Sequence, residues 1–298
     1  MDQTNLHIIG LGNLGMSFLG GFKSINSDLN LNLYESNEKT RDLLIQDGWK
    51  NVYSSIESIS NGIILLCIKP NDLNDFILEN KAKIHSDVLI CSSLAGVSVK
   101  TFESQFENKI IRLMPNLAIK QKSGFIPFTR NYTDDYLNFV ETLNTLGSTQ
   151  EYDESLFHII TAIYGSGPAW YFELSAKIVN SAVNLGMDES DANILVSNLL
   201  SSLPHLTGEK DFDEIVENIK SPKGTTEAGI NSLENNSFDK KSTSLCRLCN
   251  YKKTSPHATR ATRVRAGVCA RVAGVCHLGL GCDHGCDHGC GGDIGDPK

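Results

Sequence analysis

A glycine-rich motif near the start of the chain constrains its fold more than any other feature. Residues 10–15 form a GxGxxG pattern, which follows the short apolar run 6–9 and precedes a helical pattern. Between a strand and a helix, the first glycine permits a tight turn, the second lets a pyrophosphate approach the backbone, and the third lets helix and strand pack closely. The start of the helix adds N–H groups for the phosphates. The motif predicts a dinucleotide site made by Gly10, Gly12, Asn13, Leu14 and Gly15.

A second strand is predicted over residues 29–34, where leucine alternates with asparagine. Glu35 follows this strand where a carboxylate would hold the ribose hydroxyls of a cofactor, so it is a further candidate cofactor-binding residue. The alternative is a solvated strand end. Glu38 lies past the strand and opens the next helix. Lys39 and Arg41 in the same turn either meet a 2′-phosphate or form a solvated helix face, which is the favoured interpretation.

Three largely apolar runs, at residues 63–68, 88–91 and 109–114, extend the alternation of strands and helices. Such runs are typical of parallel strands that are buried on both faces. We therefore expect an α/β Rossmann-type dinucleotide-binding domain over residues 1–152. Ligands of open parallel sheets bind outside the carboxyl ends of the strands. The polar residues that follow these strands are either a shared rim of the site or ordinary loop residues: Lys69, Ser92, Ser93 and Asn116.

The stretch 165–170, which reads GSGPAW, marks the change from alternating elements to helices alone. Proline is favoured in the first turn of a helix, so we expect Ser166 to cap a helix that runs from Pro168 to Leu185. The glycines either admit a ligand to the backbone or serve an ordinary tight turn. Upstream, residues 153–163 carry an apolar stripe at helical spacing, which we expect to lie in the core.

Three more helices are predicted beyond this point, over residues 188–200, 213–219 and 227–234. The helix expected from Pro168 to Leu185 is apolar on several faces, which favours its burial in a subunit interface. Thr225 and Thr226 are expected to cap the last helix, whose N–H groups offer either a carboxylate site or plain capping. We therefore expect an all-α dimerisation and substrate domain over residues 153–245.

The composition excludes several functional classes. With a net charge of −8, no basic domain is present to meet nucleic acid phosphates. No apolar run approaches the length of a membrane span, and residues 1–7 show no basic region ahead of an apolar one. A cytoplasmic protein without nucleic-acid or membrane partners is expected. Cys67 and Cys91 lie in apolar runs and are expected to be buried free thiols.

Taken together, these segments resemble the pyrroline-5-carboxylate reductase family over residues 5 to 240. The pair formed by GSGPA and SPxGTT is the most specific part of the likeness. The resemblance implies a Rossmann domain, a helical dimerisation domain and a homodimer or larger homo-oligomer. The segments that carry it are Gly10–Met16, Lys69-Pro70, Arg112–Asn116, Gly165–Ala169 and Ser221–Thr226.

The resemblance also implies a reaction. A hydride from NADPH or NADH adds to the imine carbon of 1-pyrroline-5-carboxylate, a proton reaches the ring nitrogen, and L-proline forms. Placing the substrate under the nicotinamide supplies much of the catalysis. The implied catalytic residues are Thr226, which relays a proton or orients the substrate, and Lys69. The implied substrate-binding residues are Gly224, Thr225, Thr226, Asn116 and Ser166, and Lys69 and Pro70 join the cofactor site.

Several positions depart from the family pattern. Lys223 stands where the family usually has glycine, and it adds bulk and positive charge beside the substrate loop. Ala176 stands where an acidic residue is frequent, and Asn198 where glutamine is frequent. Family members often have a basic stretch suited to NADP after the second strand. Here that strand ends in Glu35, whose carboxylate favours NADH. Two rival interpretations therefore stay open: a paralogue that reduces another cyclic imine, and a nucleotide-binding protein without activity.

The composition changes near residue 245, and residues 246–298 form an atypical tail. Asparagine is absent from residue 252 onward, while glycine, arginine, cysteine and histidine become frequent. The repeat over residues 282–290 offers thiolate and imidazole groups that suit zinc. The favoured interpretation is a tail that is not a selected structure and is disordered. No metal site is predicted.

Overall fold

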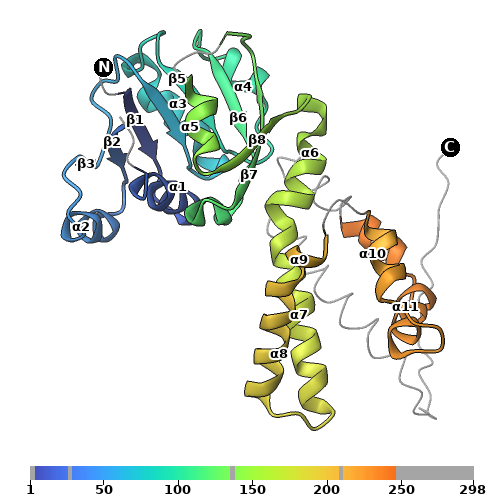
Figure 1. Cartoon of the computed structure of the whole chain (residues 1–298). Coiled ribbons are helices and arrows are strands. Elements are labelled where there is room, and N and C mark those ends of the chain that lie inside the picture. Colours follow the sequence, from blue (N-terminus) through green and yellow to red (C-terminus); the bar gives the residue numbers. More distant parts are fainter. Residues whose placement is uncertain (1–3, 26–28, 135–137, 208–210, 246–298) are drawn as a thin grey trace, which may run out of the picture. The chain divides into compact units, whose positions relative to one another are not determined.

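A computed structural model describes residues 4–25, 29–134, 138–207 and 211–245. Its N-terminal part is built on one eight-stranded sheet with the order β3-β2-β1-β4-β5-β6-β7-β8 (Figure 1). The strands are β1 (Thr4–Ile9), β2 (Leu29–Tyr34), β3 (Val52–Tyr53), β4 (Ile63–Leu66), β5 (Leu89–Ser92), β6 (Ile110–Leu113), β7 (Gly124–Arg130) and β8 (Gly147–Glu151).

Strands β1 to β6 are parallel, and Ile8 of β1 pairs with Leu33 of β2 on one side and Leu65 of β4 on the other. This order matches the doubly wound arrangement in which ligands bind where the strand order reverses, between β1 and β4. Two strands extend the sheet, because β7 runs antiparallel to β6 and β8 runs parallel to β7. The expected Rossmann-type fold is confirmed.

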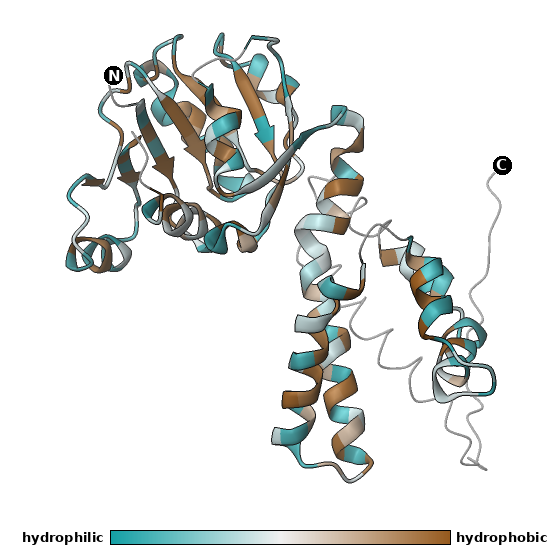
Figure 2. Cartoon of the chain, in the orientation of Figure 1, coloured by the Kyte–Doolittle hydropathy of each residue, from teal (hydrophilic) through white to brown (hydrophobic). Residues whose placement is uncertain are grey.

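Helices cover both faces of the sheet, and successive strand residues supply two separate cores. Leu6 and Ile8 of β1 belong to a core with residues of α1 (Asn13–Lys23) and α5 (Phe139–Asn144). Ile9 belongs to a core with residues of α3 (Leu73–Asn80) and α4 (Val99–Glu103). Figure 2 shows the central strands as mostly hydrophobic, as expected for strands buried on both sides. The remaining elements of this part are α2 (Glu38–Gln46), η1 (Pro70–Asp72), η2 (Lys81–Lys83) and η3 (Leu117–Gln121).

No strand follows Glu151 in the described ranges, and the later elements are all helical. Helix α7 packs against α8, and residues 238–245 are also helical. The expected all-α second part is thereby confirmed, while the boundary at residue 152 stays a prediction. The elements are η5 (Glu154–Leu156), α6 (Phe157–Ile160), η6 (Thr161–Ser166), α7 (Gly167–Asn184), α8 (Glu189–Ser202), α9 (Pro204–Thr207), α10 (Phe212–Ile219) and α11 (Thr225–Asn235).

The expectations for the start of the helical part were met only in part. Ser166 is the N-cap residue of α7, as expected, but its side chain makes no capping hydrogen bond, and the π-helical turn η6 joins α6 to α7 without a break. The stripe over residues 153–163 is not core throughout: Leu156, Ile159 and Ile163 are exposed, with Ile163 at 56%. Helical spacing identifies the face that is apolar, but it does not say whether the same chain covers that face.

Local sequence patterns predict no element between residues 117 and 146, nor a strand at β8. Strand β7 contains Pro127, which argues against an inner strand because proline donates no ladder hydrogen bond. Strand β8 reads GSTQE and is mostly exposed, so it lacks the apolar signal of a buried strand. Cys91 is buried and Cys67 is half-buried, and both are free thiols.

Candidate cofactor cradle and adjoining cavities

The glycine-rich loop between β1 and α1 has the geometry of a pyrophosphate cradle. Gly10 has φ 89°, which favours glycine. A Cβ on Gly15 would lie 2.1 Å from the Gly10 carbonyl oxygen, whereas no atom lies within 4 Å of the Cβ position of Gly12. Gly12 caps α1 without a side-chain hydrogen bond, so the first N–H groups of the helix are available to an anion. These residues fit the pyrophosphate of a dinucleotide.

Glu35 lies beside this loop, directly after β2. Its Oε2 accepts a hydrogen bond of 2.8 Å from the backbone N–H of Leu11, and its Oε1 accepts one of 2.8 Å from the N–H of Asn37. The side chain therefore ties the end of β2 to the glycine loop. The carboxylate oxygens retain further lone pairs, with which they can accept hydrogen bonds from hydroxyl groups.

Two of the cavities beside the glycine loop are candidates for the site. The first, which we call the acidic cavity, has a volume of about 310 Å³ and is lined by Gly10, Glu35 and further acidic side chains. The second, the apolar cavity, has a volume of about 810 Å³ and is lined by Leu14 of the loop and by residues beyond β6 and at the start of α7.

The π-helical turn η6 shapes one wall of the apolar cavity. The N–H of Phe125 in β7 donates a hydrogen bond of 2.7 Å to the hydroxyl of Tyr164, which holds the turn against the sheet. The Met114 sulfur lies 3.3 Å from the position of a Cβ on Gly165, so this glycine admits the Met114 side chain. Gly165 and Ser166 thereby line the cavity together with Met114 and Asn116. Turns of this type are frequent at functional sites.

A buried ion pair links β6 to the first residues of the helical part. Arg112 is 2% exposed, and its Nη1 donates a 2.9 Å hydrogen bond to Oε1 of Glu154. The same oxygen accepts a 2.7 Å hydrogen bond from the N–H of Val99 at the start of α4. The Arg112 guanidinium also lies 4.7 Å from the centre of the Phe157 ring. Burial lowers the pKa of Arg112, and the carboxylate of Glu154 opposes that effect.

Local sequence patterns do not predict this pair, because Glu154 lies 42 residues beyond Arg112 and the contact has no characteristic spacing. A buried arginine at the end of a strand needs a carboxylate partner, which is the one indication that the sequence carries.

The segment Ser221–Thr226 leads into α11. Gly224 is the N-cap residue, and α11 begins at Thr225, so the expectation that Thr225 and Thr226 cap this helix was wrong. Lys223 is exposed and has φ 59°, a left-handed conformation that an L residue adopts at a cost of about 1 kcal/mol. Its N–H donates a 2.7 Å hydrogen bond to Oε2 of Glu227, which fixes the entry to the helix.

The structure brings some of the predicted site residues together and leaves others apart. Asn116, Ser166 and Leu14 line the apolar cavity, and Gly10 and Glu35 line the acidic cavity. Asn13 lines a different hollow beside Trp49. The residues that line neither cavity are Gly12, Gly15, Lys69, Pro70, Gly224, Thr225 and Thr226. Lys69 is exposed and caps η1 through its backbone. The roles of all these residues stay predictions.

The two serines of the predicted rim have structural partners. Ser93 Oγ donates a 2.8 Å hydrogen bond to the carbonyl of Leu66 and also lines the apolar cavity. Ser92 is 1% exposed, and its Oγ accepts from the N–H of Leu94 at 3.3 Å. Ser92 therefore belongs to the interior of the sheet rather than to a rim.

Among the residues with assigned positions, no group of three or more His, Cys, Asp or Glu side chains could hold a metal ion. The Cys/His repeat at 282–290 and the rest of the tail lie outside the described residues. In the same described ranges, no helix is long and apolar enough to pass through a bilayer.

The fold and the glycine cradle define a Rossmann-type dinucleotide-binding protein with an all-helical second part. Residues 154–254 match the family model described as pyrroline-5-carboxylate reductase dimerisation. A pyrroline-5-carboxylate reductase of Methanosarcina acetivorans is 27% identical over 245 residues, which are 78% of this chain and 91% of the relative. Pyrroline-5-carboxylate reductase 2 of Bacillus subtilis is 27% identical over 251 residues, 80% of this chain and 89% of the relative. Over 78% to 80% of its length, the chain is therefore similar to curated pyrroline-5-carboxylate reductases.

Solved structures agree on the fold. The pyrroline carboxylate reductase of Plasmodium falciparum, a structure with NADP bound, aligns with a TM-score of 0.74 at 24% identity. The alignment covers 85% of this chain and 98% of the other. The 1-pyrroline-5-carboxylate reductase of Streptococcus pyogenes aligns with a TM-score of 0.72 at 22% identity, over 85% of this chain and 99% of the other.

Proposed function

We propose that this protein reduces 1-pyrroline-5-carboxylate to L-proline with NADPH or NADH, the last step of proline synthesis. The observation that carries the proposal is that the glycine cradle and the apolar cavity meet at Leu14, in a chain similar to these reductases. The bound cofactor supplies the hydride. The cradle holds the pyrophosphate, and the apolar cavity excludes water from the nicotinamide and the imine, which strengthens the interactions within it.

We assign the substrate carboxylate to the start of α11. The N-cap Gly224 has no side chain, and the N–H groups of Thr225 and Thr226 belong to the first turn, where helical N–H groups lack partners within the helix. An anion is favoured there. Asn116 and Ser166 lie on the apolar cavity and orient the ring. Lys69 and Pro70 are assigned to the cofactor side, with Lys69 as a second catalytic candidate.

The proposed active protein is a homodimer or a larger homo-oligomer. Gly224, Thr225 and Thr226 are not among the residues that line the apolar cavity of one chain. A second copy that presents its own 224–226 segment would complete the site. The proposed domains are residues 1–152 for the cofactor and 153–245 for dimerisation and substrate, which the start of the family-model match at residue 154 supports. A cytoplasmic location is part of the proposal.

The direct test follows the absorbance of the reduced nicotinamide while the full chain is mixed with pyrroline-5-carboxylate and either cofactor. Turnover that depends on the imine and yields proline is the expected result. Binding of the cofactor without turnover would contradict the proposal, as would turnover only with a different cyclic imine.

Thr226→Ala tests the role of the hydroxyl. We expect a fall in kcat of about tenfold or more, because a positioned proton donor or relay contributes about 10²–10⁴-fold when it acts directly. The matched control is Thr101→Ala, which removes a threonine from the first turn of α4, outside the cavities. Equal kinetics for the two variants would show that the Thr226 hydroxyl has no role in turnover.

A further inference from the structure

The carboxylate of Glu35, directly after β2, is a held negative charge in the lining of the acidic cavity. Both oxygens of Glu35 are held by backbone N–H groups, from Leu11 and Asn37, at 2.8 Å each. The carboxylate therefore cannot turn away without breaking two hydrogen bonds. One of these donors belongs to the glycine loop, so the charge lies next to the predicted position of the pyrophosphate and its ribose.

The other charged residues of the acidic cavity reinforce this charge. Asp72, Asp75 and Glu79, on η1 and α3, share the cavity with Glu35. Lys83 is the only cation among the lining residues, and its ammonium lies 3.4 Å from Oδ1 of Asn80. A ligand group that enters this cavity thus meets four carboxylates and one ammonium. Hydroxyl groups are suited to such a lining, whereas a dianionic phosphate is not.

Two cations follow β2 closely in the sequence, but neither lines the acidic cavity. Nη1 of Arg41 donates hydrogen bonds of 2.9 Å to the carbonyl of Glu35 and 2.7 Å to that of Ser36. Arg41 thus closes the turn after β2 and is not among the residues that line the acidic cavity. Lys39 is exposed and does not line the cavity either.

We propose that Glu35, supported by the acidic cavity, makes this protein selective for NADH over NADPH. The inference rests on the proposed function and deepens it by naming the residue that discriminates between the two cofactors. Glu35 accepts hydrogen bonds from the adenosine ribose hydroxyls of NADH. The 2′-phosphate of NADPH would bring negative charge next to the same carboxylate, and like charges at such distances oppose binding.

Binding and turnover are measured separately to test this. The full chain is titrated with NADH and with NADPH, and the fluorescence of the reduced nicotinamide gives each Kd. We expect the Kd for NADPH to exceed that for NADH by about tenfold or more, which corresponds to a repulsion of about 1.4 kcal/mol or more. The ratio of the Kd for NADPH to the Kd for NADH should decrease as salt is added, because salt screens charge repulsion and leaves a steric preference unchanged.

Glu35→Gln removes the charge and keeps an oxygen for the Leu11 N–H. We expect it to reduce the ratio of the two Kd values, mainly through tighter NADPH binding. Glu38→Gln is the matched control, since Glu38 lies in the first turn of α2, outside the acidic cavity, and should leave the ratio as it was. The melting temperature of each variant shows that it is folded.

Equal or tighter binding of NADPH by the unmodified chain would overturn the selectivity, as would a ratio that Glu35→Gln does not change. The outcome for the proposed function is separate. Selective NADH binding without imine reduction would support the role of Glu35 and contradict the reductase activity. Imine reduction that runs equally well with NADPH would support the reductase activity and contradict the role of Glu35.

Discussion

Gly12 and Gly15 lie in one loop but meet different physical demands. A methyl group on Gly15 would overlap the carbonyl oxygen of Gly10, at 2.1 Å, so Gly15→Ala must push α1 away from β1. We expect a loss of stability of about 1–3 kcal/mol, which is usual for overpacking. Thermal unfolding measured by circular dichroism gives the change in melting temperature.

Gly12→Ala is expected to separate binding from folding. The backbone at Gly12 is extended, with φ −72°, and no atom lies within 4 Å of the Cβ position. Alanine should therefore leave the melting temperature nearly unchanged while its methyl group occupies the pyrophosphate cradle. NADH affinity should fall by about tenfold, the cost of one lost charge-assisted hydrogen bond. If stability and affinity fell together in both variants, the cradle would have been misassigned.

His7 makes stability depend on pH. The side chain is 8% exposed, and its Nδ1 lies 3.2 Å from the hydroxyl of Tyr34. Burial lowers the pKa of His7 below its ordinary value of 6.5. The unfolded chain therefore binds more protons than the folded chain just below pH 6.5, and the free energy of unfolding decreases as the pH falls through that range.

Denaturant titrations at a series of pH values check this. We expect the free energy of unfolding of His7→Gln to decrease less than that of the unmodified chain as the pH falls below neutral. His85→Gln is the control, because the His85 side chain is 58% exposed beside Asp87. A slope that persists in His7→Gln and disappears in His85→Gln would assign the effect to the wrong histidine.

Among the elements, the junction of β6, α4 and η5 depends on one carboxylate. Glu154→Gln would leave the buried guanidinium of Arg112 without a counter-ion and weaken the bond to the Val99 N–H. Breaking a buried pair costs about 3–5 kcal/mol, and because the Glu154 side chain is 33% exposed we expect about 1–3 kcal/mol. Denaturant unfolding measures the loss.

Glu151→Gln is the companion variant for this junction. Glu151 pairs with Arg130 at 3.1 Å, but its side chain is 46% exposed, so solvent screens the interaction. We expect a loss below about 1 kcal/mol. If the two variants lost similar amounts of unfolding free energy, the Arg112–Glu154 pair would stabilise the fold no more than the exposed pair does.

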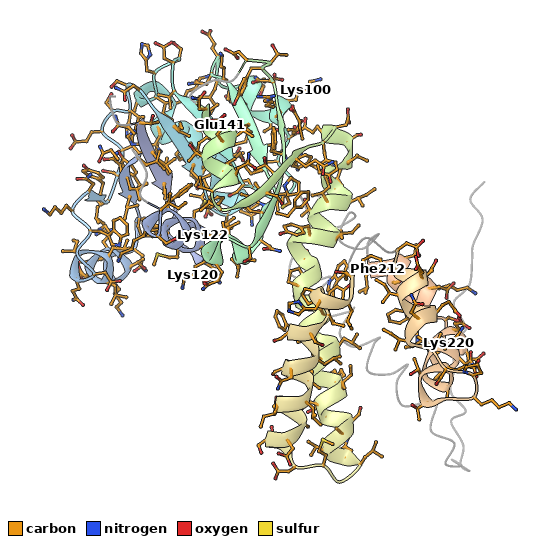
Figure 3. The ribbon with its side chains drawn as sticks, in the orientation of Figure 1. Lys100, Lys120, Lys122, Glu141, Phe212 and Lys220 are labelled. Carbon is orange, nitrogen blue, oxygen red and sulfur yellow. The ribbon has the colours of Figure 1, made fainter. Side chains whose placement is uncertain are left out.

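On the scale of the whole molecule, the helical part exposes many large apolar side chains. Figure 2 shows hydrophobic segments along α7, α8 and α10, and Figure 3 shows the Phe212 side chain at the start of α10. Exposed apolar patches of this kind mark interaction surfaces. The side chains include Tyr171, Phe172, Leu174, Ile178, Ile194, Leu195, Leu199 and Phe212, the last at 78% exposure.

A second copy of the chain should cover this surface. We expect analytical ultracentrifugation to give a dimer or larger assembly, and Leu199→Asp to shift it toward monomer with a loss of reductase activity. Leu78→Asp is the control, because Leu78 is an isolated apolar residue on α3 with 82% exposure. A monomeric unmodified chain with full activity would contradict both the assembly and the shared site.

The sequence predicted those features that arise from local patterns. The glycine motif and the buried apolar runs predicted β1, β4, β5 and β6 correctly, while the ligand site at the carboxyl ends of these strands stays a prediction. Features that depend on distant partners were missed, such as the pair of Arg112 with Glu154 and the contact of Tyr164 with Phe125. The exposure of Ile159 was also missed, since burial depends on what packs against a helix rather than on the helix itself.

The π-helical turn at Thr161–Ser166 has a consequence for every residue that follows it. Such a turn amounts to one additional residue within an otherwise α-helical path. Each residue of an α-helix advances the direction of the side chains by about 100°. Deletion of a single position here would therefore rotate the apolar side of α7 through about a quarter of a circle, although no contact surface had been mutated. The additional residue of the π-helical turn therefore sets the rotation of α7 about its axis. That rotation determines the direction in which the apolar side of α7 can contact a second copy of the chain.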